Sequence, residues 1–289
     1  MSAAPAVNGD GPLAIICGGG SLPLTIADLV TARGRAVVLF PLYGAADLRS
    51  DARYPHHWVH VGQLGRFARL ARAAGCRDVV FIGSLVRPAL WQLRLDWTTL
   101  TVLPRVAAAY RGGDDHLLSG VAQEFERQGF RMLGAHEVAP EILVPKGAFG
   151  RAQPSQRAQA DIAFGLDYLR AAGPFDIGQA VVVANKHVLA VEAAEGTDAM
   201  LMRVAQLRAN GRIREASGGV LVKAPKPAQD RRFDLPSIGP KTVEGAVGAG
   251  LSGVAVVAGE TVVAEPEALL VAADRANIFV IGVPAGTAR

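Results

Sequence analysis

Short apolar runs alternate with helix-like segments through the first half of the chain, and this alternation restricts the fold more than any other feature. The runs LAIIC, AVVLFPL, HWVHVG, DVVFIGSL and FRMLGA predict strands. The segments PLTIADLVTARG, QLGRFARLARAAG and DDHLLSGVAQEFERQG have the apolar spacing of helices. Strands that are apolar throughout are typical of a parallel sheet covered by helices on both faces. We therefore predict an α/β protein whose N-terminal half forms a parallel sheet covered by helices.

The second half of the chain mixes hairpins with crossover connections. QAVVVANKHVLAVEAA predicts two strands joined by a turn at Asn185–His187, and VAVVAGETVVAE predicts a second hairpin. DAMLMRVAQLRANG and PEALLVAADRAN predict helices, and IFVIGV predicts a last strand. Residues 144–159, rich in Gly, Pro, Gln and Arg, separate the two halves. We therefore expect two domains, residues 1–150 and residues 151–289, the second of mixed α/β type.

Composition and charge exclude several classes of protein. Half of the 289 residues are hydrophobic, which predicts a substantial core. The net charge of +4 is dispersed, so it favours small anionic ligands but provides no cationic groove for nucleic acid. Two cysteines, Cys17 and Cys76, are too few for a disulfide framework, and we expect buried thiols. Neither a signal peptide nor an apolar span of about 20 residues is evident, so we expect a cytoplasmic protein.

The glycine-rich stretch CGGGSLP, residues 17–23, follows the first apolar run and opens the first helix. It could be a tight strand-to-helix turn, or a cradle whose backbone amides and helix dipole bind phosphate. A dinucleotide fingerprint would require Gly where Pro23 stands, and the acid expected after the second strand is absent. The pattern therefore disfavours NAD.

Three acidic residues, Glu192, Glu195 and Asp198, crowd the stretch EAAEGTDAM. Helix N-capping by Thr197 or Asp198, with acids favoured by the helix dipole, accounts for one or two of these groups. Carboxylates held close together need a cation or a shared proton, and hard oxygen ligands suit Mg²⁺. Capping and Mg²⁺ binding both remain open at this point.

The segment VKAPKPAQDRRFDLPSIGPKT, residues 222–242, holds seven charged residues and four prolines. A solvated loop with self-cancelling charges is the plainest explanation. The segment follows an apolar strand, however, and its prolines restrict the backbone. Lysines fixed near phosphate, with an aspartate near metal or water, would suit phosphoryl-type chemistry.

Three weaker candidates lie elsewhere in the chain. GGDDH, residues 112–116, could bind metal or begin a helix, and GRAQPS could bind an anion through Arg151 and Ser155 or simply be a linker. In HHWVH, residues 56–60, a strand would point His57 and His60 to opposite faces, which disfavours a metal site.

Several motifs together resemble the LpxI-type UDP-2,3-diacylglucosamine pyrophosphatases of lipid A biosynthesis. The resemblance extends from about Leu13 to Gly282 and rests on GGGSLP, GSLVRP, GDDHLL, DIGQAVVV, VEAAEGTDAM, VLVKAPKPAQDRRFDLPSIGP and AGLSGVAV. It implies Mg²⁺-dependent hydrolysis of UDP-2,3-diacylglucosamine to UMP and 2,3-diacylglucosamine 1-phosphate, or lipid X. It also implies a Rossmann-like N-terminal domain, residues 1–150, that binds nucleotide or substrate, and a mixed α/β C-terminal domain, residues 151–289, with the catalytic metal site. The substrate would be held between the two domains of a homodimer from a Gram-negative bacterium. Peripheral contact with the inner membrane is a further expectation.

The resemblance also implies roles for individual residues. Asp230 would be the essential acid that helps to hold Mg²⁺ or orients the attacking water, with Glu195 and Asp198 as further metal-site acids. Ala228 is apolar within KPAQD, where we expect Gly or a polar residue. The cations expected to neutralise the pyrophosphate are Lys223, Lys226 and Arg232, and the other expected substrate contacts are Gly19, Gly20, Ser21, Leu22, Gln179, Thr197, Gln229 and Thr242.

Two other functions stay open from the residues alone. An NAD(P)-dependent oxidoreductase would use the Rossmann-like domain, although Pro23 and the missing acid argue against it. A non-catalytic nucleotide-sugar binder that regulates envelope synthesis would bind a UDP-sugar tightly, without turnover and without Mg²⁺.

Overall fold

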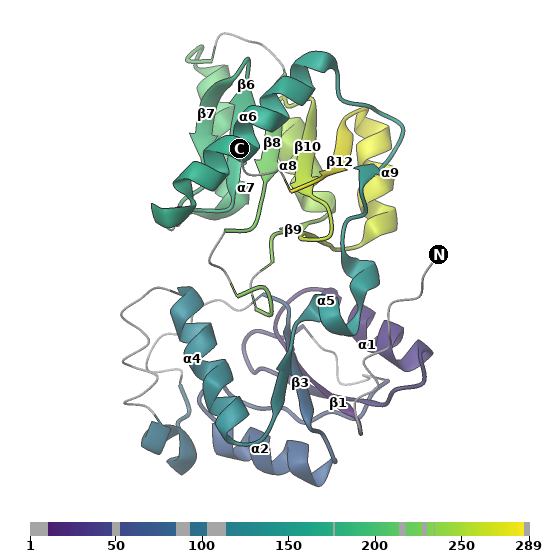
Figure 1. Ribbon diagram of the computed structural model, residues 1–289, viewed down its shortest axis with the longest axis vertical. Coiled ribbons are helices and arrows are strands. Elements are labelled where there is room, and N and C mark those ends of the chain that lie inside the picture. Colours follow the sequence, from purple (N-terminus) through teal and green to yellow (C-terminus); the bar gives the residue numbers. More distant parts are fainter. Residues whose placement is uncertain are drawn as a thin grey trace. The chain divides into compact units, whose positions relative to one another are not determined.

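The computed structural model describes residues 11–47, 53–84, 93–102, 114–175, 177–213, 218–226, 230–233 and 235–285. The chain divides into two compact units (Figure 1). The first comprises Met1–Pro140 together with Asp230–Asp234, and the second comprises Glu141–Gln229 and Leu235–Arg289. The division falls before residue 150, the expected boundary, because residues 147 and 148 pair with a strand of the second unit.

The first unit contains a four-stranded, fully parallel sheet in the order β2-β1-β3-β4. The central strand β1 is buried along its whole length, which explains its continuous apolar sequence. Both the α/β class and the parallel sheet predicted from the alternating pattern are confirmed. The elements are β1 (Leu13–Cys17), α1 (Leu22–Ala32), β2 (Val37–Pro41), α2 (Leu64–Ala73), β3 (Asp78–Ile82), α4 (Asp114–Arg127), β4 (Arg131–Leu133) and α5 (Ala135–Val138).

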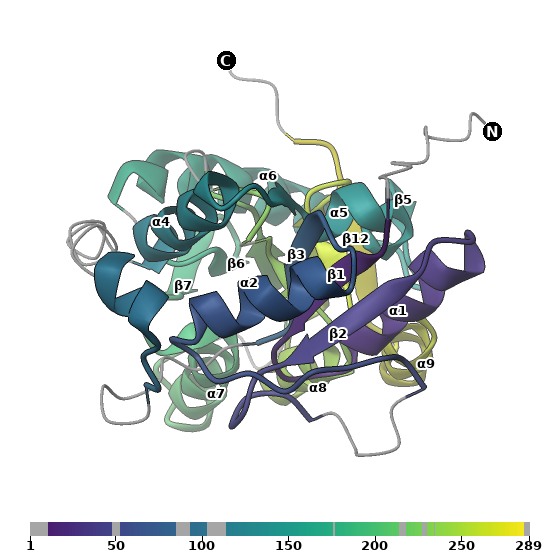
Figure 2. The same cartoon turned by 90° about the horizontal axis from the view of Figure 1, so that it is seen from below.

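Helices cover both faces of this sheet. An aromatic cluster joins one face to α2 and α4, with Phe67 lying 4.6 Å from Phe40 and 5.0 Å from Phe125 between ring centroids. On the other side, α1 contacts β1 and β2, and α5 contacts β3 (Figure 2). Both cysteines are free and buried, as expected, and burial raises the pKa of the Cys17 thiol to about 12.

The second unit contains a six-stranded mixed sheet in the order β5-β12-β10-β8-β6-β7. Strands β8, β10 and β12 are parallel, whereas β6 runs antiparallel to both β7 and β8. A separate parallel pair, β9 with β11, lies outside this sheet. The elements are β5 (Gly147–Ala148), α6 (Gln156–Ala172), β6 (Ala180–Ala184), β7 (His187–Val191), α7 (Gly196–Ala209), β8 (Val220–Lys223), β9 (Ser237–Ile238), α8 (Pro240–Gly248), β10 (Gly253–Val257), β11 (Val262–Val263), α9 (Pro266–Ala276) and β12 (Phe279–Val283).

Alternate residues of β6 face different layers of helices. Val181 and Val183 belong to the core beneath α6, whereas Val182 belongs to the core shared with α7, α8 and α9. This division follows from the two-residue period of a strand. Figure 1 shows α6 crossing the sheet, with α7, α8 and α9 as further helices of this unit.

The predicted hairpin between β6 and β7 is confirmed. Asn185 and Lys186 have positive φ angles of 56° and 55°, as a two-residue turn between twisted strands requires. The buried Asp161 carboxylate of α6 accepts hydrogen bonds from both of their amides, at 3.1 and 2.6 Å. A side chain in α6 therefore fixes the turn of the neighbouring hairpin.

Two sequence predictions of local structure are wrong. HWVHVG does not form a regular strand: Val59 makes one isolated bridge, to Leu42 just beyond β2, and His56, the residue before this run, makes another to Leu39 of β2. VAVVAGETVVAE is not a hairpin, because β10 enters the large sheet while β11 pairs with β9. Within the described ranges, no helix combines the length and apolarity that crossing a bilayer demands.

Candidate functional site

The glycine turn after β1 lies against the segment that follows β3. The Gly18 amide donates to Ile82 O at 2.7 Å and the Gly19 amide to Ser84 O at 2.8 Å. A Cβ atom on Gly18 would collide with the Ser84 carbonyl, so this close approach itself requires glycine. The tight-turn explanation thus accounts for the first two glycines, whose amides are engaged within the protein.

An acid that the sequence reading did not single out lies beside the same turn. The Asp47 carboxylate accepts a hydrogen bond from the Gly20 amide at 3.3 Å. Gly20 has a φ of 92°, a left-handed conformation that favours glycine. Gly20 and Ser21 are exposed, and Leu22 begins α1. A carboxylate at this position favours a sugar hydroxyl over a phosphate as the nearby ligand group, since like charges repel.

In the second unit, three expected substrate-binding residues are brought together. Lys223 ends β8, Gln179 precedes the antiparallel strand β6, and Thr197 lies in the first turn of α7. The Glu192 carboxylate joins them, because it accepts from the Gln179 amide at 2.8 Å and from Thr197 Oγ1 at 2.7 Å. Lys223 Nζ donates to Thr197 Oγ1 at 3.0 Å and to Ser237 O at 3.1 Å.

Lys223 is unusual because its side chain is buried, with 8% of the residue exposed. Lysine is almost never buried unless its charge is compensated. Here a hydroxyl and a backbone carbonyl accept from the ammonium, and Glu192 lies one hydrogen bond further away. The arrangement fixes a positive charge at the carboxyl end of a parallel strand, where α/β proteins commonly bind ligands.

The other acids of EAAEGTDAM are used differently. Glu195 pairs with Arg203 at 2.8 Å and accepts from the Ala193 amide at 3.2 Å, while Asp198 is exposed in the first turn of α7. Over the described ranges, no three His, Cys, Asp or Glu side chains gather as a metal-binding group. Asp230 belongs to the first unit, whereas Glu195 and Asp198 belong to the second. Their joint role in metal binding therefore stays a prediction.

Asp230 and Arg232 form a fork-shaped ion pair in the first unit. Arg232 Nη2 and Nε approach the carboxylate at 2.8 and 3.1 Å, and the Arg232 amide also donates to it at 3.1 Å. Arg232 Nη1 donates to Glu126 of α4 at 2.8 Å. Phe233, beside Arg232, packs edge-on against Phe81 of β3. These contacts fix residues 230–233 to the first unit, although they are at least about 100 residues away in sequence from the residues they contact.

These contacts determine the charge on Asp230. The hydrogen bonds from Arg232 hold the pKa of Asp230 below its usual value, and the charge of His136 acts in the same direction. The Arg232 pKa is raised by the same pair and by Glu126. Asp230 is therefore ionised at neutral pH, with its side chain 26% exposed. Each carboxylate oxygen can accept more than one hydrogen bond or ligand, so Asp230 keeps acceptor capacity.

The remaining expected residues are more dispersed. Thr242 lies in the first turn of α8, where its hydroxyl accepts from the Gly239 amide at 3.3 Å. Lys226 is half-buried a few residues beyond β8.

Some of the expected positions cannot be placed in this way. Gln229 and Ala228 lie outside the described residues, as do residues 112 and 113 of GGDDH. His57 and His60 make separate ring contacts, with Phe40 and Tyr43 respectively.

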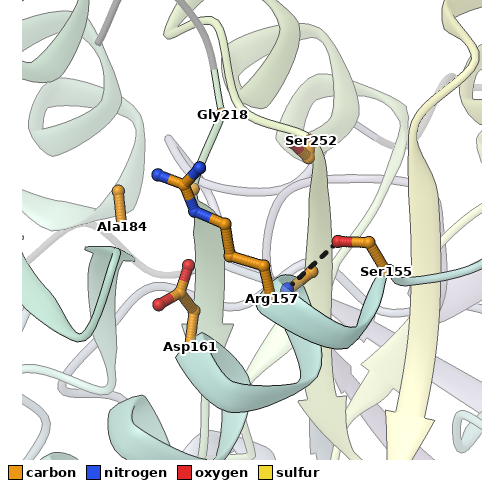
Figure 3. A pocket seen from close by; sticks show the side chains of 8 residues that line it. Ser155, Arg157, Asp161, Ala184, Gly218 and Ser252 are labelled. Atoms are coloured by element: carbon orange, nitrogen blue, oxygen red, sulfur yellow. Dashed lines mark hydrogen bonds between the residues drawn. The ribbon is translucent and has the colours of Figure 1, made fainter.

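A cavity of about 250 Å³ lies beside the large sheet, at the end of strand β8 opposite to Lys223 (Figure 3). Its lining includes Ala184 at the end of β6 and Gly219 before β8, so it is at the amino end of the strand that Lys223 ends. Ser155 lines it but also caps α6, accepting from the Ala158 amide at 3.2 Å. Arg151, its expected partner for an anion, pairs with Asp274 instead. None of the expected substrate-binding residues lines this cavity.

Sequence reasoning missed several groups that complete these clusters. Asp47, Glu126 and His136 belong to the first unit, and Ser237 contributes a backbone carbonyl in the second. Asp47, Glu126 and His136 lie far in sequence from the residues they affect, and Ser237 acts through a backbone carbonyl, which every residue has. No local pattern of residue types therefore indicates these groups. Glu192 differs from these groups, because its place in the acidic run EAAEGTDAM had already drawn attention to it.

Comparison with known proteins agrees with this division of the chain. The model of the LpxI N-terminal domain matches residues 12–142, and the model of the LpxI C-terminal domain matches residues 145–281. The chain belongs to the LpxI family. A curated LpxI from Caulobacter vibrioides, UDP-2,3-diacylglucosamine pyrophosphatase LpxI, is 46% identical over 272 residues, covering 94% of this chain and 97% of the relative. The family expected from the motifs is thus confirmed, and LpxI architecture places Asp230 within the C-terminal family domain although it packs with the first unit.

Proposed function

We propose that the chain is a hydrolase that splits the pyrophosphate of UDP-2,3-diacylglucosamine into UMP and lipid X during lipid A biosynthesis. Membership of the LpxI family and the name of the Caulobacter relative support the substrate class. The observation that carries the site assignment is the ionised Asp230 carboxylate, held by Arg232 within a charged, proline-rich segment.

Hydrolysis forms a bond from water oxygen to one phosphorus and breaks the bond from that phosphorus to the bridging oxygen. A carboxylate whose pKa lies below its usual value is a poor proton acceptor but a good hydrogen-bond acceptor and ligand. Asp230 therefore acts in this proposal by orienting the attacking water or holding a metal ion. The water proton leaves for solvent or a phosphate oxygen, and the bridging oxygen stays with the departing phosphate.

The cations stabilise charge that develops on the phosphate oxygens. Lys223 is positioned by Thr197 and Ser237, so its ammonium needs little reorganisation during the reaction. Arg232 presents a planar guanidinium that suits phosphate oxygens. Lys226 follows Lys223 on the same proline-rich segment, and in this proposal it adds a third positive charge.

Magnesium is the cofactor we propose for this reaction. Mg²⁺ is usually held by one or two carboxylates plus substrate phosphates and waters, so a preformed cluster of three acids is not required. The ionised Asp230, with acceptor capacity to spare, fits such a ligand, and Asp198 and Glu195 are the further acids we propose. When bound, the ion would neutralise phosphate charge and polarise a phosphoryl oxygen.

The proposal extends to the setting of the enzyme. We propose a homodimer in the cytoplasm of a Gram-negative bacterium, in peripheral contact with the inner membrane. The diacyl substrate and the lipid X product both carry acyl chains, so the enzyme must exchange them with a membrane. The glycine-turn residues Gly19 to Leu22, with Gln179 and Thr242, are proposed as further substrate contacts.

The test is release of UMP from UDP-2,3-diacylglucosamine by the purified chain and by Asp230→Asn, with Mg²⁺ and with a chelator. We expect metal-dependent release by the unmodified chain and a loss of about 10²–10³-fold in Asp230→Asn, the range typical of removing one preorganised polar group from a reaction site. Asp167→Asn is the matched control, because Asp167 is an exposed residue of α6 that pairs with Arg170, one helical turn away.

Each outcome separates a different part of the proposal. Equal rates in Asp230→Asn and the control would remove Asp230 from the site. Release that persists with chelator would remove Mg²⁺. Binding of substrate without any UMP release would favour a nucleotide-sugar binding protein instead.

A further inference from the structure

A small helical surface in the first unit exposes large apolar side chains. Trp97 is 81% exposed, Leu100 45% and Leu95 38%. Residues 97–102 are helical, so Trp97 and Leu100, three positions apart, project from the same side. Solitary exposed apolar residues need no explanation, but three neighbours that include a tryptophan indicate a contact surface.

The exposure of Trp97 does not come from a loosely held segment. The adjacent Asp96 carboxylate accepts from the Thr99 amide and from the Arg66 amide, both at 2.9 Å. Thr99 Oγ1 accepts from the Leu64 amide at 3.1 Å. These bonds fasten the segment to the first turn of α2. Gly65 permits the close approach, because a Cβ atom there would collide with Thr98.

Two arginines border the apolar side chains. Arg66 lies on α2 and Arg94 precedes Leu95, and both are exposed. Burial lowers the pKa of His60, and the positive charges of Arg94 and Arg66 lower it further, so both arginines lie near this ring. Neither guanidinium has a carboxylate partner among the residues that the structure describes. Asp96, the nearby acid, is occupied by backbone amides of α2 and by Thr99.

We propose that Leu95, Trp97, Leu100, Arg66 and Arg94, the Trp97 surface, docks on a membrane containing anionic phospholipid. Tryptophan rings concentrate at the boundary between lipid headgroups and acyl chains, because one part of the ring is apolar and the other carries an N–H donor. Arginines beside them pair with phosphate groups, and each basic side chain near an anionic surface strengthens binding. Charge complementarity therefore selects a phospholipid surface over a neutral protein groove.

This proposal deepens the proposed function, and its purpose rests on that function. The substrate and product of the proposed reaction both carry two acyl chains and therefore reside in the bilayer, so an enzyme bound to the bilayer surface has direct access to both. One exposed tryptophan, two leucines and two arginines provide only weak, reversible attachment, which suits a protein that must also release lipid X.

The experiment is sedimentation of the full chain with vesicles, in the absence of substrate. We expect binding to vesicles of phosphatidylethanolamine and phosphatidylglycerol, and much weaker binding to phosphatidylcholine or at high salt. Trp97→Ser combined with Leu100→Ser should weaken binding about tenfold through lost apolar burial. Arg66→Gln and Arg94→Gln should each weaken it about fivefold, since one basic side chain contributes about 1 kcal/mol at an anionic surface.

Matched controls lie in the second unit. Phe175 is 76% exposed and Arg157 is also exposed, so Phe175→Ser and Arg157→Gln remove comparable groups elsewhere and should leave vesicle binding unchanged. Absence of binding by the unmodified chain, or equal binding by all variants, would overturn the proposal. So would a change of oligomeric state in Trp97→Ser, because the surface would then join copies of the chain.

Hydrolysis of detergent-dispersed substrate separates this proposal from the proposed function. We expect the variants of the Trp97 surface to keep the rate of the unmodified chain in detergent and to lose rate only on vesicles. If vesicle binding follows the prediction but no variant hydrolyses substrate, the docking surface stands and the proposed function fails.

Discussion

A single hydroxyl group connects two opposite charges in the second unit. Thr197 Oγ1 donates to Glu192 at 2.7 Å and accepts from the buried Lys223 at 3.0 Å. Its hydrogen is committed to the carboxylate, so its lone pairs face the ammonium. The same residue also occupies the first turn of α7, where its place is fixed by helix geometry. Thr197 therefore orients Lys223 more precisely than a direct, flexible ion pair would.

Replacing Thr197 by Val keeps the shape of the side chain and removes this connection. We expect Thr197→Val to lower the free energy of unfolding by about 1–3 kcal/mol, because Lys223 and Glu192 each lose a hydrogen-bond partner in a partly or fully buried place. Thr197→Ser keeps the hydroxyl and should lose far less. Urea unfolding measures both. Equal stability of Thr197→Val and the unmodified chain would mean that water replaces the hydroxyl at no cost.

The sequence identified the polar residues of this cluster but not how they are joined. Lys223 and Thr197 stood out because their motifs are specific and their types suit phosphate chemistry. Glu192 stood out only as one of three crowded acids, and the structure separates the three: Glu192 binds Thr197, and Glu195 pairs with Arg203. Local spacing cannot reveal which of several like charges finds which partner, because the partners come from other strands and helices.

At the scale of elements, a buried acid ties together the amino ends of the first sheet. Asp78 begins β3, and its carboxylate receives Arg131 of β4 at 2.8 Å and Arg35, just before β2, at 2.5 Å. Burial alone would raise the pKa of Asp78, but the hydrogen bonds from Arg131 and Arg35 outweigh burial and lower it. One carboxylate thus links the amino ends of three strands of the sheet, β2, β3 and β4.

The ion pairs of Asp78 with Arg35 and Arg131 make the stability of the protein decrease in acid. Because the folded-state pKa of Asp78 is below its unfolded value, its contribution is fully present above about pH 4 and is lost as pH falls through the folded value. We expect Asp78→Asn to cost about 2–3 kcal/mol at neutral pH, since Arg35 then loses its buried partner. The cost should shrink in acid. Urea unfolding from pH 7 to pH 3 measures it, and a cost independent of pH would contradict the assignment.

The helix α6 packs so closely on β8 that one of its residues must be glycine. A Cβ atom on Gly165 would lie 2.7 Å from Val222 Cγ2 and 3.0 Å from Val222 Cβ. The β-branched Val222 side chain is fully buried and cannot swing aside. Helix propensity alone predicts that replacing Gly165 by alanine stabilises the protein, whereas this close packing predicts that the replacement destabilises it.

Gly165→Ala should destabilise the protein by about 1–3 kcal/mol through overpacking, although alanine is the better helix former. Gly248→Ala is the matched control, because a Cβ atom at Gly248, the last residue of α8, meets nothing within 4 Å. That control should be neutral or stabilising by up to about 1 kcal/mol. Thermal unfolding of both variants decides, and stabilisation by Gly165→Ala would show that the two elements can move apart.

At the scale of the whole molecule, the sequence predicted the class of fold and the elements with strong patterns. The parallel sheet of the first unit follows from its uninterrupted apolar strands. The helix α6 was missed because residues 144–159 resemble a linker and its apolar side chains are mixed with polar ones. The wrong hairpin near β11 has a different cause, since each short run is a genuine strand and only the pairing differs. Pairing between distant strands depends on packing that local patterns do not record.

The return of residues 230–234 to the first unit has a consequence for any attempt to divide the protein. The polypeptide passes from one unit to the other three times, after Pro140, before Asp230 and after Asp234. A cut between the two family domains therefore puts Asp230 and Arg232 on one fragment and Glu126 on the other. A chimaera made by exchanging halves between relatives would likewise combine Asp230 and Arg232 from one parent with Glu126 from the other. In such hybrids, residues 230–234 and the residues they contact in the first unit, such as Glu126 and Phe81, should come from the same parent. Otherwise Asp230, the acid proposed to be essential, lacks the contacts that position it.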